Sequence, residues 1–394
     1  MPTSHTEQDQ FSSNRKLVLA GQIAFFPTGI LTTLLGPMLP ILLARWALND
    51  TEAGNLFLVQ FLASLVGVQL SGVLLARWGF RPAFLSGLLL MAAGVATLYI
   101  GSHPQGLISV ATYGLGLGLI VPTDNLLIAE ISTGAEANSN AGARASAVSL
   151  LNFFWGVGAV FCSLMVAWTA AHKLLPFFLG AVAIFLVLLA WMMRNLPFPP
   201  AAKAGESSVP WRDLLKGPTI WFFAAVFFLY PGAETAVGGW IGSYVSRLGT
   251  RGAAMASIMP AFFWLALTLG RALGTAFLRH FSEDRVLRFG YGTAVAGIGL
   301  ILWVPVLSGV IAGALITGLS FATLYPITVA RLSQRFGLAA RSIGAVMFSL
   351  ASIGPALIPW MVGLTSHTTG SLRAGLLLPL GATIVLFLLH VVQW

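Results

Sequence analysis

Cysteine is almost absent, since Cys162 is the one cysteine in 394 residues. One cysteine can form neither an intramolecular disulfide nor a cysteine metal site. Its apolar surroundings at 160–167 favour a buried, unreactive thiol. The six histidines lie in the expected tail, loops and helix ends without metal-ligand spacing, and no nucleophile lies beside a general base. We therefore predict no metal, no cofactor and no enzymatic activity.

Charge is also scarce. Charged residues make up 8% of the chain and only 12 residues are acidic, whereas 57% are hydrophobic. Apolar runs of about 20 residues, the length that crosses a bilayer as a helix, recur along the whole chain. The net charge of +9 comes from basic residues scattered through short loops, so nucleic acid is not an expected partner. The composition predicts an all-α integral membrane protein with the lipid bilayer as its partner.

The apolar runs predict about twelve transmembrane helices. Most Lys and Arg residues fall in loops on the side of the N-terminus, so the positive-inside rule places both termini in the cytoplasm. The expected location is a bacterial-type inner (plasma) membrane, crossed many times. The expected spans are 17–43, 53–75, 82–100, 107–131, 145–169, 174–193, 218–246, 253–278, 285–304, 307–333, 342–366 and 373–393.

A long polar stretch divides the chain nearly in half. It is rich in proline, which marks a linker. We therefore expect a cytoplasmic tail at 1–16, a six-helix bundle at 17–193, a cytoplasmic linker at 194–217 and a second six-helix bundle at 218–394. The end of the linker, 211–216, is either a short amphipathic helix at the membrane surface or a plain tether.

The two halves echo each other at an offset near 200 residues, which predicts a pseudo-symmetric pair of bundles. Each echo is short, but all keep the same order along the chain. The echoes are Gly72 with Arg77 and Gly274 with Arg279, Gly118-Leu119 and Gly318-Leu319, and Ala143-Arg144 and Ala340-Arg341.

The loop at 72–81 resembles the Gly-x-x-x-Asp-Arg-x-Gly-x-Arg motif of the major facilitator superfamily. The resemblance implies a gating role for Gly72, Arg77, Gly79 and Arg81. Ala76 stands where the family usually has Asp, an acid that helps latch the cytoplasmic side. Any latch here is weaker or differently built, with the arginines binding carbonyls at helix ends, or the arginines only anchor the topology.

Two further segments resemble the fucose-proton symporter branch, which includes sodium-dependent glucose carriers. Residues 230–244 are similar to its helix 7, and 118–125 to its acid-Thr-x-x-Asn run in helix 4. Asn125 aligns with the branch, Val121 replaces its acid, and Asp124 supplies an acid three residues later. The resemblance implies an uptake carrier for a small sugar.

Asp124 and Glu234 lie inside apolar spans, where a carboxylate costs about 2.5–3.5 kcal/mol and usually has a function. We expect both to bind the coupling ion, a proton or sodium. Tyr230 lies one turn from Glu234 and is placed to hydrogen-bond it. Glycines near Glu234 permit a bent or broken helix that suits a sodium site or an outer gate. The alternative is a protonated Glu234 that only joins two helices.

Asp124 belongs to the fourth span. Burial without a cation favours its protonated form, so it can bind and release a proton during transport. Arg271 is the basic residue inside a span, and a pair with Asp124 across the two halves is one option. A permanent salt bridge is another. We expect Arg271 to be structural, because its Gly-Arg-x-x-x-Gly setting resembles a packing motif.

Sugar binding needs paired donors and acceptors together with an aromatic face. The preferred candidates from the spans are Gln22, Asn125, Asn152, Trp155, Tyr230 and Tyr325. Each of them has an alternative role as interhelical hydrogen-bonding group or interfacial aromatic.

The leading hypothesis is a monomeric secondary transporter that takes up a small polar solute, with a monosaccharide expected, by proton or sodium symport through alternating access. One alternative is an exporter of amphipathic drugs or lipids. Another is a membrane receptor or scaffold that transports nothing.

Overall fold

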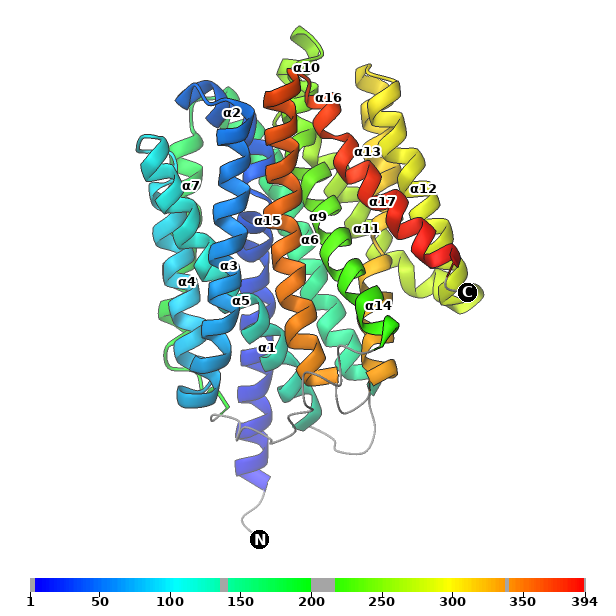
Figure 1. The fold of residues 1–394 in the computed structure, drawn as a ribbon. Coiled ribbons are helices and arrows are strands. Elements are labelled where there is room, and N and C mark those ends of the chain that lie inside the picture. The colour runs from blue at the N-terminus through cyan, green and yellow to red at the C-terminus, as the bar shows by residue number, and fades with distance from the viewer. Residues whose placement is uncertain (1–3, 135–140, 200–216, 337–339, 393–394) are drawn as a thin grey trace. The chain divides into compact units, whose positions relative to one another are not determined.

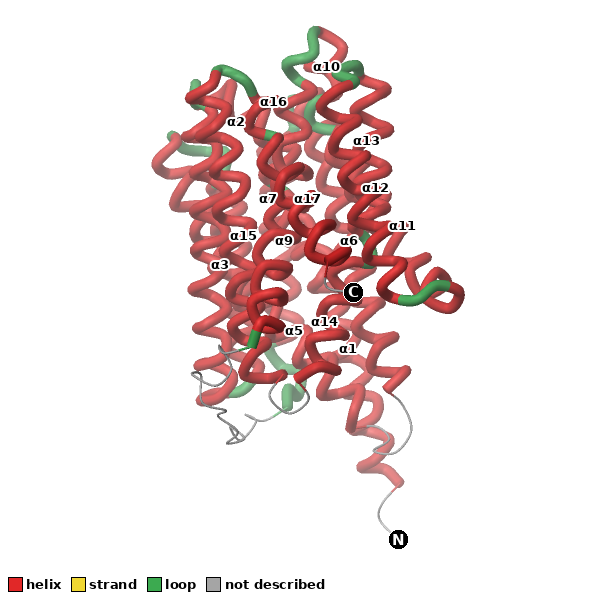
Figure 2. Tube along the Cα trace, turned by 45° about the vertical axis from the view of Figure 1, so that its right-hand side comes forward, coloured by secondary structure: helices red, strands yellow, loops and turns green. Residues whose placement is uncertain are grey.

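The computed structural model describes residues 4–134, 141–199, 217–336 and 340–392, and within these ranges the regular elements are all helices (Figures 1 and 2). Eleven of these helices are long and apolar enough to cross a membrane. A twelfth, α11 (Met259–His280), lies at the expected span 253–278 with a shorter apolar part, Met259–Gly274. The expectation of about twelve spans is therefore confirmed.

The first half of the chain contains seven helices. The first expected span is divided at Leu34 into two helices, and the first of these begins at Ser4, well before residue 17. The elements are α1 (Ser4–Thr33), α2 (Leu35–Trp46), α3 (Asp50–Trp78), α4 (Phe80–Thr97), α5 (His103–Gly134), α6 (Ala141–Ala171) and α7 (Leu175–Met193).

The second half is more interrupted. Its expected tenth span, 307–333, is broken at Ala322 and Thr323, because Pro326 has no N–H to donate to the carbonyl four residues earlier. The elements are α9 (Pro218–Val245), α10 (Thr250–Met255), α11, α12 (Glu283–Trp303), α13 (Leu307–Phe321), α14 (Leu324–Phe336), α15 (Ala340–Thr369), α16 (Leu372–Gly375) and α17 (Leu377–Val392).

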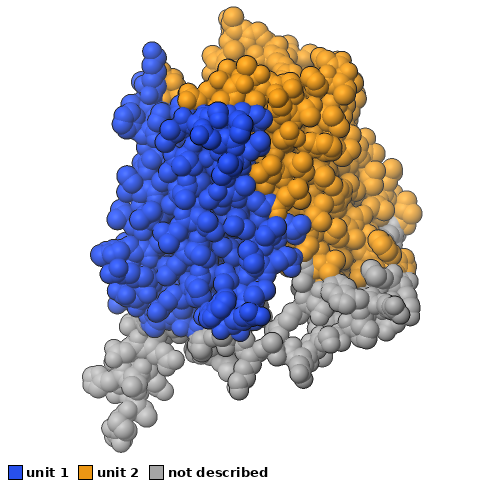
Figure 3. Space-filling view, turned by 60° about the vertical axis from the view of Figure 1, so that its left-hand side comes forward, with its two compact units in different colours: residues 1–32, 63–159, 172–204 blue, residues 33–62, 160–171, 205–394 orange. Residues whose placement is uncertain are grey.

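The contacts divide the chain into two compact units (Figure 3). Unit 1 contains residues 1–32, 63–159 and 172–204, and unit 2 contains 33–62, 160–171 and 205–394. All of α2 and parts of α3 and α6 thus belong to unit 2 although they precede the expected linker. Most of that linker, at 200–216, lies outside the described residues, so the division at 194–217 stays a prediction.

Glycine contacts repeat between the units. In unit 1, a Cβ at Gly158 would overlap the Phe26 carbonyl, which brings α6 against α1. In unit 2, a Cβ at Gly354 would overlap the Phe228 carbonyl, which brings α15 against α9. These two contacts lie near the same 200-residue offset.

The expected echo of Gly118 and Gly318 is a second repeated contact. Gly118 of α5 packs on the Ser64 carbonyl of α3, and Gly318 of α13 packs on the Phe263 carbonyl of α11. Close approach of helix backbones at small residues is how membrane helices pack. The echo therefore reflects a duplicated packing scheme.

The glycine-arginine motif covers the end of α3, the single linking residue Gly79 and the start of α4. Gly79 has φ +78°, a conformation that favours glycine. Arg81 donates a hydrogen bond of 2.8 Å to the Leu196 carbonyl just after α7, and its guanidinium lies 6.0 Å from the centre of the Phe198 ring. Arg77 and Gly72 are exposed. Arg81 thus binds a carbonyl near a helix end, as one of the two hypotheses required, whereas the gating role of the motif stays a prediction.

The start of α3 is held tightly within unit 2. Asn49 and Glu52 exchange two hydrogen bonds of 2.9 Å, which cap the helix reciprocally. Asp50 accepts two hydrogen bonds from Arg247, of 3.0 and 2.5 Å, and one of 2.5 Å from the Ser366 hydroxyl. We call Asp50, Arg247 and Ser366 the Asp50 cluster. It ties the start of α3 to the end of α9 and to α15.

Candidate functional site

Glu234 lies on α9, which runs as one continuous helix from Pro218 to Val245. A broken helix around Glu234 is therefore not observed, whereas the bend stays a prediction, with Pro231 inside the helix. The nearby glycines serve packing instead: Gly232 approaches the Gly354 carbonyl of α15, and Gly238 approaches the ring of Trp264 on α11. Close packing of this helix leaves Glu234 among side chains of unit 2.

The Tyr230 hydroxyl lies between two oxygen atoms. It is 2.5 Å from Glu234 Oε2 and 2.8 Å from the carbonyl oxygen of Phe321. Tyr230 is almost fully buried. The hydrogen bond between Tyr230 and Glu234 that their spacing predicted is present, and Phe321 is an additional partner.

Tyr325 and Arg271 complete a group around Glu234. The ring of Tyr325 stacks on that of Tyr230, with centres 5.8 Å apart and an angle of 17° between the planes. The positive charge of Arg271 acts on Glu234, Tyr230 and Tyr325. We call Tyr230, Glu234, Arg271 and Tyr325 the Glu234 cluster; it gathers residues from α9, α11 and α14. Whether Arg271 also pairs with Asp124 stays a hypothesis.

Asp124 lies on α5 in unit 1 and is 0% exposed. Neither carboxyl oxygen has a hydrogen-bond partner among the described residues. One face of the carboxyl lies against Gly21 of α1, where an added Cβ would overlap Oδ1. Because burying an ionised, unpaired carboxylate is very costly, this environment fits a protonated carboxyl.

The remaining solute-binding candidates of unit 1 are spread over three helices. The Trp155 indole of α6 donates a 3.4 Å hydrogen bond to Thr32 of α1. Asn125 turns its amide to the Val121 carbonyl of its own helix, at 2.8 Å. Gln22 is buried on α1, and Asn152 is half-buried on α6. Trp155 with Thr32 is thus the pair from this group that joins two helices.

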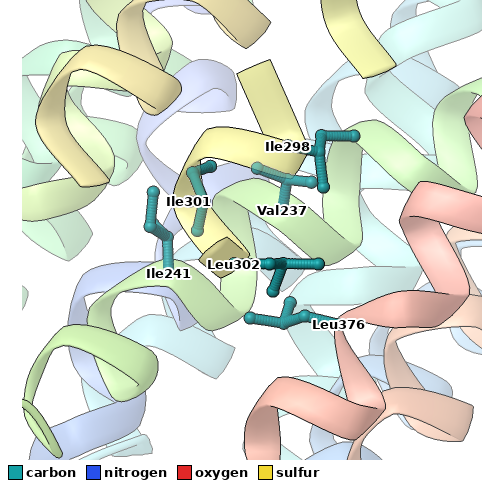
Figure 4. A pocket seen from close by; sticks show the side chains of 6 residues that line it. All are labelled: Val237, Ile241, Ile298, Ile301, Leu302 and Leu376. Atoms are coloured by element: carbon teal, nitrogen blue, oxygen red, sulfur yellow. The ribbon is translucent and has the colours of Figure 1, made fainter. Parts of the chain in front are cut away.

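A pocket in unit 2 lies apart from these polar groups (Figure 4). Its lining comes from α9, α12 and the residue that follows α16, and is entirely apolar. A sugar would find no hydrogen-bonding side chain there. The lining residues are Val237, Ile241, Ile298, Ile301, Leu302 and Leu376.

Three features of the structure were not predicted from the sequence. They are the break between α13 and α14, the contact of Gly21 with Asp124, and the partners of Asp50. Pro326 was the available signal for the helix break that exposes the Phe321 carbonyl. Nothing in the sequence indicated the contact of Gly21 with Asp124, because that contact depends on which helix crosses α1 at Gly21. Asn49 followed by Asp50 is a helix-start signal, but it gives no information on the partners of Asp50, which are Arg247 just after α9 and Ser366 of α15.

Many apolar helices and a carboxyl group inside a membrane-spanning helix of each unit define a polytopic membrane transport protein. The family model of the Major Facilitator Superfamily matches residues 23–359. The chain belongs to this family, so it is a transporter and not an enzyme. The family resemblance of the loop at 72–81 is confirmed.

Known proteins of this family resemble the chain over most of its length. The glucose/mannose transporter GlcP of Bacillus subtilis (strain 168) is 21% identical over 364 residues, which cover 89% of this chain and 88% of that protein. The nucleoside transporter NupG has a similar structure, with a TM-score of 0.76, 14% identity and coverage of 96% of this chain and 100% of NupG. The E. coli fucose:proton symporter FucP also has a similar structure, with a TM-score of 0.67, 16% identity and coverage of 97% of this chain and 99% of FucP.

Proposed function

We propose that this transporter takes up a small polar solute, a monosaccharide in the first instance, by symport with a proton or sodium through alternating access. The observation that carries the proposal is the pair of carboxyl groups within membrane-spanning helices, the buried Asp124 in unit 1 and the half-buried Glu234 in unit 2. Carboxyl groups at membrane depth are characteristic of ion-coupled carriers. The names of GlcP and FucP support a sugar as the solute.

A proton is the favoured coupling ion at Asp124. Hard cations are held by several oxygen ligands at once, and the described residues offer no hydrogen-bonding group to either oxygen of this carboxyl. A proton needs no such set of ligands. Its release requires water to reach the carboxyl, so the face against Gly21 has to open during the cycle.

The solute would use aromatic and hydroxyl groups, and each unit by itself offers one such pair. Trp155 with Thr32 in unit 1 and the stacked Tyr230 and Tyr325 in unit 2 each combine a ring with a hydroxyl. A ring covers the CH face of a sugar, and hydroxyls satisfy its polar edge. Gln22, Asn125 and Asn152 stay candidates for further hydrogen bonds.

The Asp50 cluster lies at the outer end if the termini are cytoplasmic, as the basic loops favour. The starts and ends of α3, α9 and α15 are joined there by three hydrogen bonds. The described state would then have this end of unit 2 closed on the outer side.

Export of an amphipathic solute stays the alternative. The apolar pocket of Figure 4 does not favour it, because the pocket has room for about one water molecule and not for a hydrocarbon solute.

Uptake into proteoliposomes tests the proposal. Radiolabelled monosaccharides and one nucleoside are offered under an imposed proton gradient and then a sodium gradient. We expect accumulation under the proton gradient, loss of accumulation with retained exchange in Asp124→Asn and Glu234→Gln, and normal accumulation in Glu52→Gln, where the new amide still caps α3. Folded protein that accumulates no solute under either gradient would favour the exporter, and accumulation by both carboxyl variants would remove the acids from coupling.

A further inference from the structure

The contacts of Tyr230 report how many protons the Glu234 cluster holds. A tyrosine hydroxyl has one proton to donate, and a backbone carbonyl has none. Yet the Tyr230 oxygen lies at hydrogen-bonding distance from both Glu234 Oε2 and the Phe321 carbonyl, at 2.5 and 2.8 Å. Two such oxygen–oxygen contacts need two protons.

Glu234 is the group that can supply the second proton. A protonated carboxyl is a donor, whereas an ionised one only accepts. With the proton on Glu234, its carboxyl donates to the Tyr230 oxygen, and the Tyr230 hydroxyl donates to Phe321. Without that proton, Tyr230 must turn its hydrogen to the carboxylate, and the Phe321 carbonyl loses its donor.

The Phe321 carbonyl occupies a sensitive place in the fold. Phe321 is the last residue of α13, and the chain resumes as α14 only at Leu324. The last carbonyls of a helix lack partners within the helix, so a side chain that donates to one of them stabilises that end. Tyr230 thus supports the helix end at this break, and Tyr325, just beyond the break, stacks on the same ring.

We propose that Glu234, Tyr230 and the Phe321 carbonyl form a proton-controlled switch that links ion binding at α9 to the break between α13 and α14. The switch deepens the proposed function and rests on it in one respect, the role of Glu234 as a coupling group. Protonated Glu234 holds the helix end through Tyr230. When the proton leaves to water, the Tyr230 hydroxyl rotates to Glu234, and the helix end is released together with Tyr325.

The other groups that face Glu234 and Tyr230 do not titrate in this way. Arg271 on α11 keeps its charge at all working pH values and compensates the carboxylate once the proton has left. Tyr325 on α14 and Tyr291 on α12 are neighbouring phenols, which are neutral in the same range. Among these groups, Glu234 is the one whose proton the switch moves.

Hydrogen exchange of the full-length protein in nanodiscs, read by mass spectrometry over residues 318–328 at several pH values, tests the switch. Rates are corrected for the intrinsic effect of pH. In the parent protein we expect protection of this segment to fall about threefold to tenfold as pH rises, the range for one lost hydrogen bond. Glu234→Gln, whose amide imitates the protonated donor, should stay protected at every pH, and Tyr230→Phe should stay unprotected at every pH.

Tyr291→Phe is the matched control. It also removes a buried phenol hydroxyl from unit 2, but that hydroxyl has no hydrogen-bond partner among the described residues. It should follow the parent. A pH response that persists in Tyr230→Phe, or one that is absent from the parent, would overturn the switch.

Transport measurements separate the failure of the switch from the failure of the proposed function. Tyr230 is also a solute-binding candidate, so exchange of solute is measured beside accumulation in the same variant. In Tyr230→Phe the switch predicts that proton-driven accumulation falls at least about tenfold more than exchange does, the effect of one lost charge-assisted hydrogen bond. Accumulation by Glu234→Gln would refute coupling at Glu234 but leave the exchange result intact. Normal accumulation by Tyr230→Phe would refute the switch and leave Asp124 as the coupling site.

Discussion

The Asp50 cluster gives the sharpest prediction on stability. Asp50→Ala removes the acceptor of three hydrogen bonds, two from Arg247 and one from Ser366. The side chain of Asp50 is 11% exposed, whereas that of Arg247 is 42% exposed. The carboxylate is therefore the buried member of the pair, and the guanidinium can return to water.

This difference in exposure decides the magnitude. An ion pair with a well-exposed partner contributes about 0.2–1 kcal/mol. A buried hydroxyl that donates to a charged group contributes about 1.5–3 kcal/mol. We therefore expect Asp50→Ala to cost about 2 kcal/mol, which lowers the melting temperature by about 4–8 °C for a unit of this size. Ser366→Ala should account for more of that loss than Arg247→Ala does.

Thermal unfolding in detergent, followed by the fluorescence of the buried tryptophans, measures the effect. The matched control is Arg251→Ala, which removes a charge from an exposed arginine of α10 that has no ion pair among the described residues; it should shift stability by no more than about 0.5 kcal/mol. The double variant Asp50→Ala with Ser366→Ala should melt close to Asp50→Ala alone. Equal melting temperatures for Asp50→Ala and the parent, or strictly additive losses in the double variant, would refute the reasoning.

Three further predictions concern single contacts. Gly21→Ala should destabilise the protein by about 1–3 kcal/mol through overlap with Asp124. Gly180→Ala, with open space at its Cβ, should be neutral or stabilising in the same melting assay. Equal effects of the two variants would contradict the packing described for Asp124. Gly79→Ala should cost about 1 kcal/mol because its φ is +78°, and an unchanged melting temperature would argue against that turn. Trp155→Ala and Asn152→Ala should weaken solute binding at least about tenfold, the loss expected when a buried polar partner in a site is left unpaired. Their melting temperatures should stay near that of the parent. Unstable variants with normal affinity would make both residues structural.

Much of the fold could be predicted because a bilayer permits few solutions. Apolar runs of spanning length have to be helices, since no water is present to satisfy an open backbone. The four-residue spacing of Tyr230 and Glu234 likewise predicted their hydrogen bond, because residues i and i+4 share a helix face. Within one helix, spacing alone decides which side chains meet.

Contacts between helices could not be predicted in the same way. The meeting of Gly21 with Asp124 depends on where α1 crosses α5, and the partners of Asp50 lie about 200 and 300 residues away in the sequence. From the sequence, the glycines around Glu234 suit a bent or broken helix, but in the structure they bring α9 close to α15 and α11. A glycine in a membrane helix permits both outcomes, and only the neighbouring helix decides between them.

The hydrogen bond from Arg81 to Leu196 has a consequence for how the chain can be rebuilt. Because the hydrogen bond of Arg81 and the contact of Phe84 with Phe198 attach the end of the first half to α4, the point where the chain leaves that half is fixed by the half itself. A soluble reporter domain inserted directly after residue 199, or a chain cut there and expressed as two fragments, should leave this exit point in place.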